Sequence, residues 1–394
     1  MRRVAAAEGD SLPETRSLVT TISRWCNDHE RPSEFYQDIL CKALRKSRPQ
    51  LGFGEGSPPE DESGTEPEDL ARVLEASNVG PLAIAQIEAK LISRGGELPN
   101  TPPALLRRPL LDDYRQVTAW LGGSQPVAQR RRLYTVAAQL AGMVGTVSFD
   151  LHDPVKAEAY YQVALKAAGE AGDDPVAAWV LANISYLEVH RGAMQAALQA
   201  AQAAAARVAR SAGITTQHAW LAALEAELHA GLGDAPATRT ALQRAEHAIE
   251  QARPETRRAG IDFFTPEKLP AHMGSCFMLL GQPKLAHEFS AEALNRLGPR
   301  AKSRWFVRVD LATALVQQGE LEEAVTLAGA SLTALSGDDW TPRLEQRVKD
   351  FRRVLQPFST ARAVRSFNER FPTPRGAYLA QRGEPDQDSG PEPR

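Results

Sequence analysis

The sequence predicts an all-α protein that is built as a solenoid of helical hairpins. Apolar residues follow helical periodicity almost continuously from Tyr114 to about Leu355. Hydrophobic residues make up 43% of the chain and aromatic residues only 6%, and much of the hydrophobic fraction is alanine. Alanine is the strongest helix former, and its small side chain lets helices approach closely. A short pattern of small residues also recurs along this region, which is typical of a repeat array.

Short breaks rich in glycine, proline and aspartate divide the periodic region into helices of ordinary length. These breaks lie at Gly122-Gly123, Asp173-Asp174-Pro175, Gly213, Gly233-Asp234, Pro254, Pro266, Gly281-Gln282-Pro283, Gly298-Pro299, Gly319 and Gly337-Asp338. Residues 68–95 are also expected to be helical, with Leu70, Val73 and Leu74 at helical spacing, and 96–108 are expected to form a proline-rich loop. The 394 residues exceed the roughly 250–300 at which a single core stops growing, so several domains or a repeat array are expected.

One five-position pattern recurs five times in the periodic region. A small residue opens it, a turn residue follows seven positions later, and three small or apolar residues stand 5, 9 and 12 positions after the turn. The turn residues are at 152, 192, 233, 281 and 319, so successive copies are 40, 41, 48 and 38 residues apart. The copies are Gly145, His152, Ala157, Tyr161, Ala164; Ser185, Gly192, Ala197, Ala201, Ala204; Ala226, Gly233, Thr238, Leu242, Ala245; Gly274, Gly281, Ala286, Ser290, Ala293; and Ala312, Gly319, Ala324, Ala328, Ser331.

This spacing indicates pairs of helices that cross closely at small residues and reverse direction at the turn. It resembles the tetratricopeptide repeat, and the resemblance implies that each hairpin covers the apolar face of the next in a solenoid. The period is longer than the family's usual length of about 34 residues. The family's aromatic positions are mostly filled by Ala, Ser or Leu here. A generic alanine-rich helical bundle is the alternative.

Composition excludes several classes of protein. The chain has 46 basic and 49 acidic residues and a formal net charge of −3, so it shows no global commitment to nucleic acid. The chain has three cysteines, an odd number, and no two of them have CxxC spacing. This argues against a disulfide framework and favours a reducing compartment. No apolar segment follows the basic start, and no window approaches about 18 apolar residues. We therefore expect a cytoplasmic protein without a membrane partner.

The sequence contains no pattern that predicts catalysis. The eight histidines form neither an HExxH motif nor another paired metal-ligand spacing on one helix. Nucleophile-elbow, phosphate-binding and dinucleotide-binding motifs are absent from the sequence. The adjacent pairs Asp112-Asp113 and Glu322-Glu323 point to different sides of a helix and cannot converge on one atom. We expect no enzyme activity, no catalytic residue, no metal and no cofactor.

Residues 15–53 form a compact, locally basic segment near the N-terminus. Val19, Ile22 and Cys26 stand at i, i+3 and i+7, which predicts the inner face of a short helix. Small hydroxyls and a guanidinium are expected on the other side, and such groups read base edges and phosphates. A second helix is expected after Pro32 and the N-cap Ser33. Its apolar positions are Phe35, Ile39, Leu40, Ala43 and Leu44. The basic residues of the segment include Arg31, Lys42, Arg45, Lys46 and Arg48.

This segment resembles the second half of a lambda-repressor-like helix-turn-helix domain of the xenobiotic-response-element family of bacterial regulators. The resemblance is carried by the runs Ile22-Ser23-Arg24-Trp25, Arg31-Pro32-Ser33 and Leu51-Gly52-Phe53. It implies that Ser17, Thr20, Thr21 and Arg24 face the major groove of double-stranded operator DNA, with Arg31 near a phosphate.

The segment departs from the family at two places. Cys26 stands where a glutamate is usual, and only sixteen residues precede Ser17 where the family has two helices. Gly9, Asp10 and Pro13 argue against a helix-turn-helix pair in those residues. We therefore expect an N-terminally truncated domain, or a start site that is assigned too late.

Four segments are expected along the chain. Residues 1–53 form the partial DNA-binding segment, 54–67 an acidic flexible linker, 68–372 the tetratricopeptide-like array, and 373–394 a disordered tail. Bacterial regulators that join these two domain classes use the array to sense a peptide, small molecule or protein, and the composition resembles that of high-GC actinobacteria. By this resemblance the chain is a transcriptional regulator whose array could also form a homodimer.

Two functional interpretations remain open at this stage. The first is the ligand-responsive regulator, and the alternative is a protein-interaction scaffold that has lost DNA binding. Phe263-Phe264-Thr265-Pro266, where the repeat spacing stretches to 48, could line a ligand surface. A packed loop between helices is the favoured interpretation of that segment.

Overall fold

The computed structural model describes residues 1–7, 9, 11–26, 30–53, 71–72, 75–211, 213–253, 261, 263–299, 301–335 and 340–371. Helices are the only regular secondary structure among these residues, which confirms the predicted all-α class. The chain divides into two compact units, Met1–Ala76 and Ser77–Arg394, which we describe separately. The predicted linker 54–67 and tail 373–394 lie outside the described residues, as do Leu70, Val73 and Leu74.

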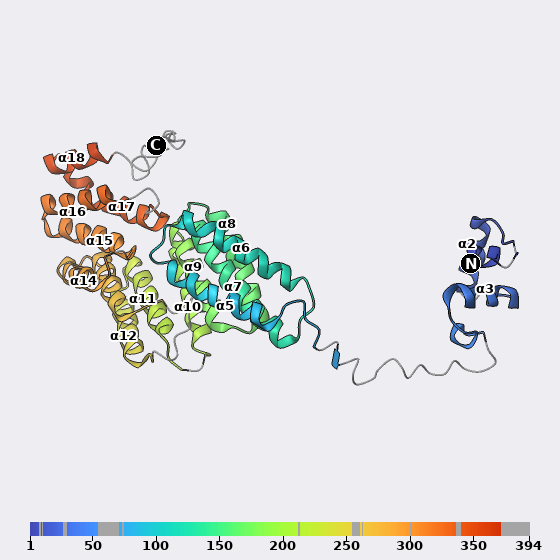
Figure 1. The fold of residues 1–394 in the computed structure, drawn as a ribbon. Helices are drawn as coiled ribbons and strands as arrows, with labels where there is room; N and C mark the ends of the chain where they lie inside the picture. Colours follow the sequence, from blue (N-terminus) through green and yellow to red (C-terminus); the bar gives the residue numbers. More distant parts are fainter. Residues whose placement is uncertain are drawn as a thin grey trace. The chain divides into compact units, whose positions relative to one another are not determined.

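The described part of unit 1 contains three short α-helices and a 3-10 turn (Figure 1). These are α1 (Arg2–Ala7), α2 (Thr15–Cys26), α3 (Glu34–Leu44) and η1 (Pro49–Leu51). Ala5, Leu18 and Ile39 are buried, one from each helix, and the rings of Trp25 and Tyr36 lie 5.0 Å apart. The predicted second helix is present with Ser33 as its N-cap residue.

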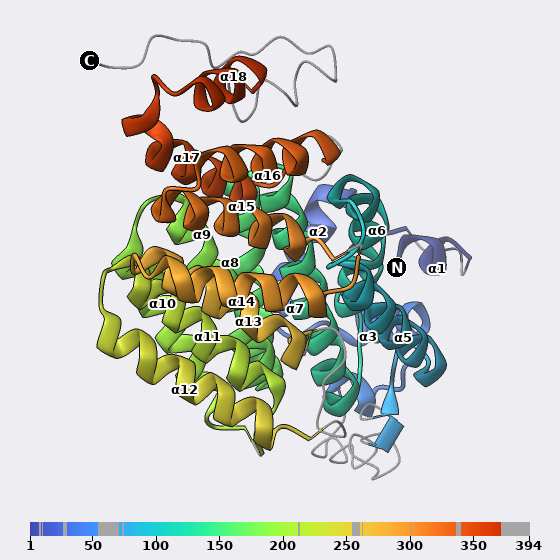
Figure 2. The ribbon, with the colours of Figure 1, turned by 90° about the vertical axis from the view of Figure 1, so that its left-hand side faces the viewer.

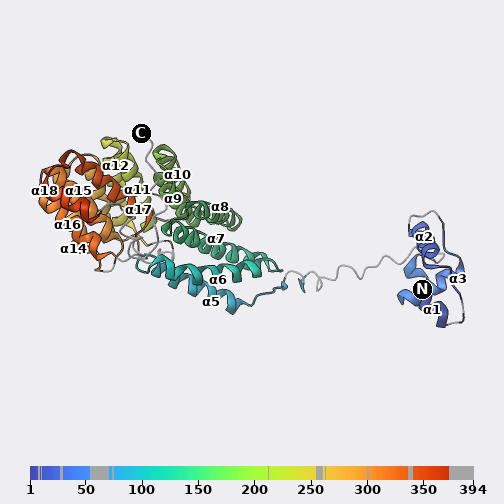
Figure 3. The same ribbon diagram turned by 90° about the horizontal axis from the view of Figure 1, so that it is seen from above.

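Unit 2 is a stack of consecutive helical pairs, as Figures 2 and 3 show. Its helices are α5 (Pro81–Glu97), α6 (Pro103–Leu121), α7 (Val127–Asp150), α8 (Pro154–Ala171), α9 (Asp174–His190), α10 (Met194–Val208), α11 (Thr216–Gly231), α12 (Ala235–Gln251), α13 (Leu269–Leu279), α14 (Pro283–Arg296), α15 (Ser303–Gln318), α16 (Leu321–Ala334), α17 (Pro342–Leu355) and α18 (Arg362–Arg370). Short 3-10 turns precede α13 and follow α17. This arrangement confirms the predicted helical solenoid.

The five predicted hairpins are α7/α8, α9/α10, α11/α12, α13/α14 and α15/α16. All five turn residues have positive φ, including the non-glycine His152 at 63°. In every turn the next backbone N–H donates to the carbonyl five residues before it, so the same cap ends each first helix. The three pattern positions that stand 5, 9 and 12 residues after each turn residue are buried in all five hairpins. At Gly274 an added Cβ would lie 2.6 Å from Ser290 Oγ, so this crossing requires glycine.

Of two predicted loops, one is shorter than expected and the other is packed as expected. The loop expected at 96–108 is shorter, because α5 extends to Glu97 and α6 begins at Pro103. Proline is tolerated in the first helical turn, where its missing N–H has no partner to lose. In the segment before α13, Phe264 is buried and Phe263 packs edge-on against Trp220 at 4.8 Å. The packed-loop interpretation is confirmed for these residues.

The last helices do not continue the pairing. α17 packs against α15 and also contacts α9 and α7, which lie far earlier in the chain. Figure 1 shows α17 extending from the C-terminal helices toward the green helices of the chain. We call the helices from α7 to α13 the central array, or the array where its contacts with α17 are described. α18 instead packs on α16. Local sequence patterns do not predict this return of α17 onto the array.

Candidate functional site

The residues predicted to contact DNA lie on and just after α2. Ser17, Thr20, Arg24 and Arg31 are exposed. Thr21 is half-buried, and its hydroxyl donates to the Ser17 carbonyl at 3.1 Å. Three of the four predicted groove-facing side chains of α2 are therefore accessible to a ligand, and Thr21 lies at their edge.

The inner face of α2 differs from the predicted one. Val19 is 61% exposed and Cys26 is exposed, whereas Leu18 is buried. Ile22 and Trp25 are half-buried, so the inner face follows Leu18, Ile22 and Trp25 at i, i+4 and i+7. The prediction of Val19 and Cys26 on this face was wrong because the large Trp25 ring, packed on α3, sets the helix rotation. This rotation explains why Thr21 is less exposed than Thr20.

The charges of unit 1 are partly neutralised within the unit. Arg24 pairs with Glu30 at 3.3 Å, and Arg48 pairs with Asp38 at 2.9 Å. Both pairs are solvent-exposed, so they contribute little and can exchange for another anion. Arg45 and Lys46 are exposed at the end of α3. These side chains can approach a phosphate without first breaking a buried interaction.

A second polar cluster joins α17 to the array, and we call it the α17 junction. Its centre is Arg347, whose Nη1 lies 2.6 and 2.7 Å from the two carboxylate oxygens of Asp310 on α15. Its Nη2 donates to Glu227 on α11 at 2.9 Å. Ser275 donates to Asp310, and His272 contacts the other Glu227 oxygen at 2.9 Å. One guanidinium therefore connects α17, α15 and α11.

Arg343 forms a second bridge one turn earlier on α17. Its guanidinium carbon lies 3.8 Å from the centre of the Tyr186 ring on α9 and 5.3 Å from that of Phe306 on α15. Both distances are in the range of cation–π attraction. The α17 junction thus contains two arginines, each of which contacts α15 and one helix of the central array.

A third contact of the junction involves the turn between α7 and α8. His152 Nε2 lies 3.0 Å from the Trp340 carbonyl, and its Nδ1 lies 3.6 Å from Glu345. Because a carbonyl only accepts, Nε2 carries the proton in this contact. The non-glycine turn residue of the first hairpin therefore also attaches the start of α17.

The pKa of Glu227 depends on two neighbouring side chains. Burial by itself favours the neutral carboxyl, but His272 and Arg347 hold the pKa of Glu227 well below its usual range. The carboxylate therefore stays charged, and loss of either neighbour would leave it with the other as a hydrogen-bonding partner. The sequence carried only a weak signal for this cluster, namely arginines at i and i+4 of a helix.

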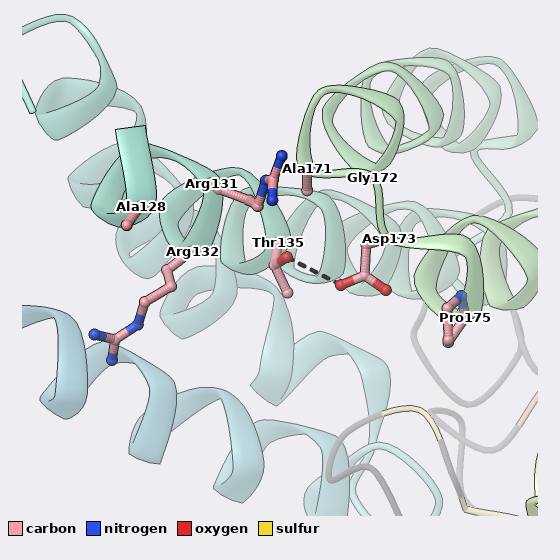
Figure 4. A pocket seen from close by; sticks show the side chains of 8 residues that line it. All are labelled: Ala128, Arg131, Arg132, Thr135, Ala171, Gly172, Asp173 and Pro175. Carbon is pink, nitrogen blue, oxygen red and sulfur yellow. Dashed lines mark hydrogen bonds between the residues drawn. The ribbon is translucent and has the colours of Figure 1, made fainter. Parts of the chain in front are cut away.

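A shallow depression of about 530 Å³ lies at the start of α7 and the turn between α8 and α9. Figure 4 shows the side chains that line it. Asp173 in its wall accepts from the Thr135 hydroxyl at 2.9 Å and from the Val176 N–H, which caps α9. Arg132 pairs with Glu88 at 2.6 Å. These side chains already have structural partners, so the depression offers no convergent set of reactive groups.

Asp174, next to this depression, provides a prediction of pH-dependent stability. Hydrogen bonds from Arg210 and Arg207 lower its pKa to about 2. A depressed pKa stabilises the fold above the unfolded pKa of about 3.9, and this contribution disappears as pH falls through about 2. Because the pair is partly exposed, we expect Asp174→Asn to cost about 1 kcal/mol or less at pH 7. Urea unfolding should show this difference shrinking from pH 4 downward, whereas a constant difference would contradict it. Asp112→Asn is the surface control.

Metal-binding clusters and membrane-spanning helices are both absent from the described part of the chain. Within the described residues, no group of three His, Cys, Asp or Glu side chains is placed to hold a metal ion. No helix among them combines the length and apolar composition that a membrane span requires. The predictions that the chain needs no metal or cofactor and is not an enzyme stay predictions.

Comparison with known proteins places the chain in no family. No protein-family model matches it, and no curated protein is significantly similar to it. The resemblances to helix-turn-helix regulators and to tetratricopeptide repeats therefore stay predictions from the sequence patterns.

Proposed function

We propose that the chain is a transcriptional regulator in which unit 1 binds double-stranded operator DNA and the helical array senses a peptide, small molecule or protein. The observation that carries the proposal is the outward face of α2, where Ser17, Thr20 and Arg24 are exposed together. Hydroxyl and guanidinium groups on one helix face are suited to base edges and phosphates. Leu18 on the opposite face is buried, so the polar face is directed outward.

The local charge supports the same proposal. Arg31, Arg45 and Lys46 are exposed around the helices of unit 1, and phosphate contacts by such groups supply most non-specific affinity for DNA. Among the described residues, Arg24 is paired with the exposed Glu30. Exchanging this carboxylate for a phosphate or a guanine edge costs little, because exposed ion pairs are weak. Binding that depends on these charges should fall steeply with salt concentration.

The experiment is a selection of genomic DNA fragments by the purified full chain at low and moderate salt. We expect a recurrent motif, and we expect Arg24→Ala to weaken binding to it about tenfold or more, the loss typical of one base contact. Arg131→Ala is the matched control, because Arg131 is an exposed arginine of unit 2. Absence of enrichment, or an equal loss in the control, would contradict DNA reading by α2.

The alternative function is a protein-interaction scaffold that does not bind DNA. It would be favoured by a failed selection combined with retained folding of unit 1. The stacked hairpins that would provide the binding surface belong to unit 2, a compact unit distinct from the one that contains α2. Solenoids of this kind commonly provide extended binding surfaces. Homodimer formation is compatible with either function.

A further inference from the structure

α17 has two chemically different sides. Its apolar side carries Leu344, Val348, Phe351 and Leu355, which are all buried in the C-terminal core with α15, α16 and α18. The Phe351 and Phe367 rings pack edge to face at 5.5 Å. The other side meets the central array mainly through the polar α17 junction. α17 is therefore an integral part of the C-terminal core and a polar neighbour of the array.

The two arginine bridges can open without leaving a buried charge unpaired. If α17 moves away from α7, α9 and α11 but stays packed on α15, Arg347 keeps Asp310, at 2.6 Å, and Ser275 on α13 stays beside Asp310 because α13 and α15 remain packed. On the array side, Glu227 keeps His272 at 2.9 Å. Breaking a buried pair is costly chiefly because one charge is stranded. Here each charged group retains an opposite or hydrogen-bonding partner in both arrangements.

The remaining contacts follow the same rule. Arg343 keeps the Phe306 ring of α15 when it leaves Tyr186. Glu345 keeps Lys349 at 2.8 Å when it leaves His152. Separating the apolar side of α17 from its own core would instead expose four buried apolar side chains to water, with no partner to replace the contacts that are lost. The interface between α17 and the array is therefore the weakest interface of this helix.

We propose that α17 is a releasable brace, which Arg343 and Arg347 attach to Tyr186 and Glu227, and that a ligand carrying guanidinium groups releases it. The array offers two groups to the brace: the Tyr186 ring, which contacts Arg343, and the Glu227 carboxylate, which pairs with Arg347. The two arginines lie one helical turn apart on α17. A helical segment with arginines one turn apart has the chemistry to compete for them. The regulatory role of the brace rests on the proposed sensing function, whereas its release from the array does not.

The test measures one distance in the full chain by pulsed electron spin resonance. Spin labels are placed at Val155→Cys on α8 and Ser366→Cys on α18, both exposed positions, after Cys26 and Cys41 are changed to serine. We expect one short distance in this background. Arg343→Ala combined with Glu227→Gln should add a longer distance, with at least a tenfold rise in its share.

Two controls separate release of the brace from general loosening. Arg353→Ala removes an exposed arginine of α17 whose ion pair within the described residues is with Asp350, so it should leave the distance unchanged. Far-UV circular dichroism checks that both variants stay folded. Glu227→Gln alone provides a milder variant that keeps the side-chain shape. An unchanged distance in the folded variants, or an equal change in Arg353→Ala, overturns the brace.

The ligand class is tested with a peptide of residues 340–357 added to the labelled chain. We expect the peptide to increase the long-distance share, and the same peptide with citrulline at positions 343 and 347 to have at least a tenfold weaker effect. Equal effects of both peptides would overturn guanidinium recognition. Because no DNA is present, these outcomes are independent of the DNA-selection result, and a failure of either proposal can be recognised by itself.

Discussion

Replacing Arg347 by methionine should destabilise unit 2 by about 3–5 kcal/mol, the range measured when one partner of a buried ion pair is removed. The side chain of Asp310 is only 3% exposed, and Arg347 is its sole cationic contact among the ion pairs of the described residues. Without the guanidinium, Asp310 retains only the Ser275 hydroxyl. Glu227 is less affected, because His272 remains beside it. Most of the cost therefore arises at Asp310.

Urea unfolding followed by far-UV circular dichroism measures this cost. Arg353→Met is the matched control, and we expect it to stay within about 0.5 kcal/mol of the parent protein because its ion pair is exposed. Adding Asp310→Asn to Arg347→Met should recover part of the loss, since the stranded charge is then removed. A cost below about 1 kcal/mol for Arg347→Met would show that the cluster is hydrated and does not hold α17.

The array could be predicted in detail because its information is local. Each hairpin is specified by a turn residue and by small residues at fixed distances from it, such as Gly281, Ala286 and Ser290. The positive φ at the turn and the close approach of the two helices both follow from these residues. Helix ends were also close to expectation, because caps and prolines act within one turn of the chain.

The α17 junction could not be predicted because its partners are distant in sequence. Arg347 pairs with Glu227, which lies 120 residues earlier, and no periodicity connects the two. An arginine pair on one helix is usually a solvated face, so the sequence alone favours the wrong environment. The contact depends on how the stack curves, which is a sum of many small hairpin rotations.

The face of α2 illustrates a smaller error of the same kind. Spacing alone allows Val19, Ile22 and Cys26 or Leu18, Ile22 and Trp25 to face inward. The choice depends on which side chain finds a partner on another helix, and the Trp25 ring packs against Tyr36. The exposed set on α2 was mostly right, because polar residues surround either apolar stripe.

The second large effect is expected at Gly142, in the crossing between α7 and α9. An added Cβ would lie 2.1 Å from the Trp179 ring, which is buried and has little room to move aside. Overpacking of this kind costs about 1–3 kcal/mol and occasionally more. We expect Gly142→Ala to reach the upper end of that range, although alanine is the better helix former. Urea unfolding of the two proteins measures the difference.

Gly169→Ala is a matched control for this prediction. Gly169 is also helical, but an added Cβ there meets nothing within 4 Å, so the variant should gain up to about 1 kcal/mol. Trp179→Leu should cost less in the Gly142→Ala background than in the parent protein, because the clash is relieved. Equal stability of the two alanine variants would contradict a rigid crossing.

The same crossing determines where the array meets α17. Tyr186 lies two turns after Trp179 on α9, so a displacement of the Trp179 ring by Gly142→Ala shifts the whole helix that carries both residues. The Tyr186 ring would then move relative to Arg343, which it contacts at 3.8 Å. Gly142 inside the stack and the arginine bridges outside it therefore both affect the position of α9 relative to α17. We expect the long-distance population of the labelled chain to rise in Gly142→Ala and to stay constant in Gly169→Ala.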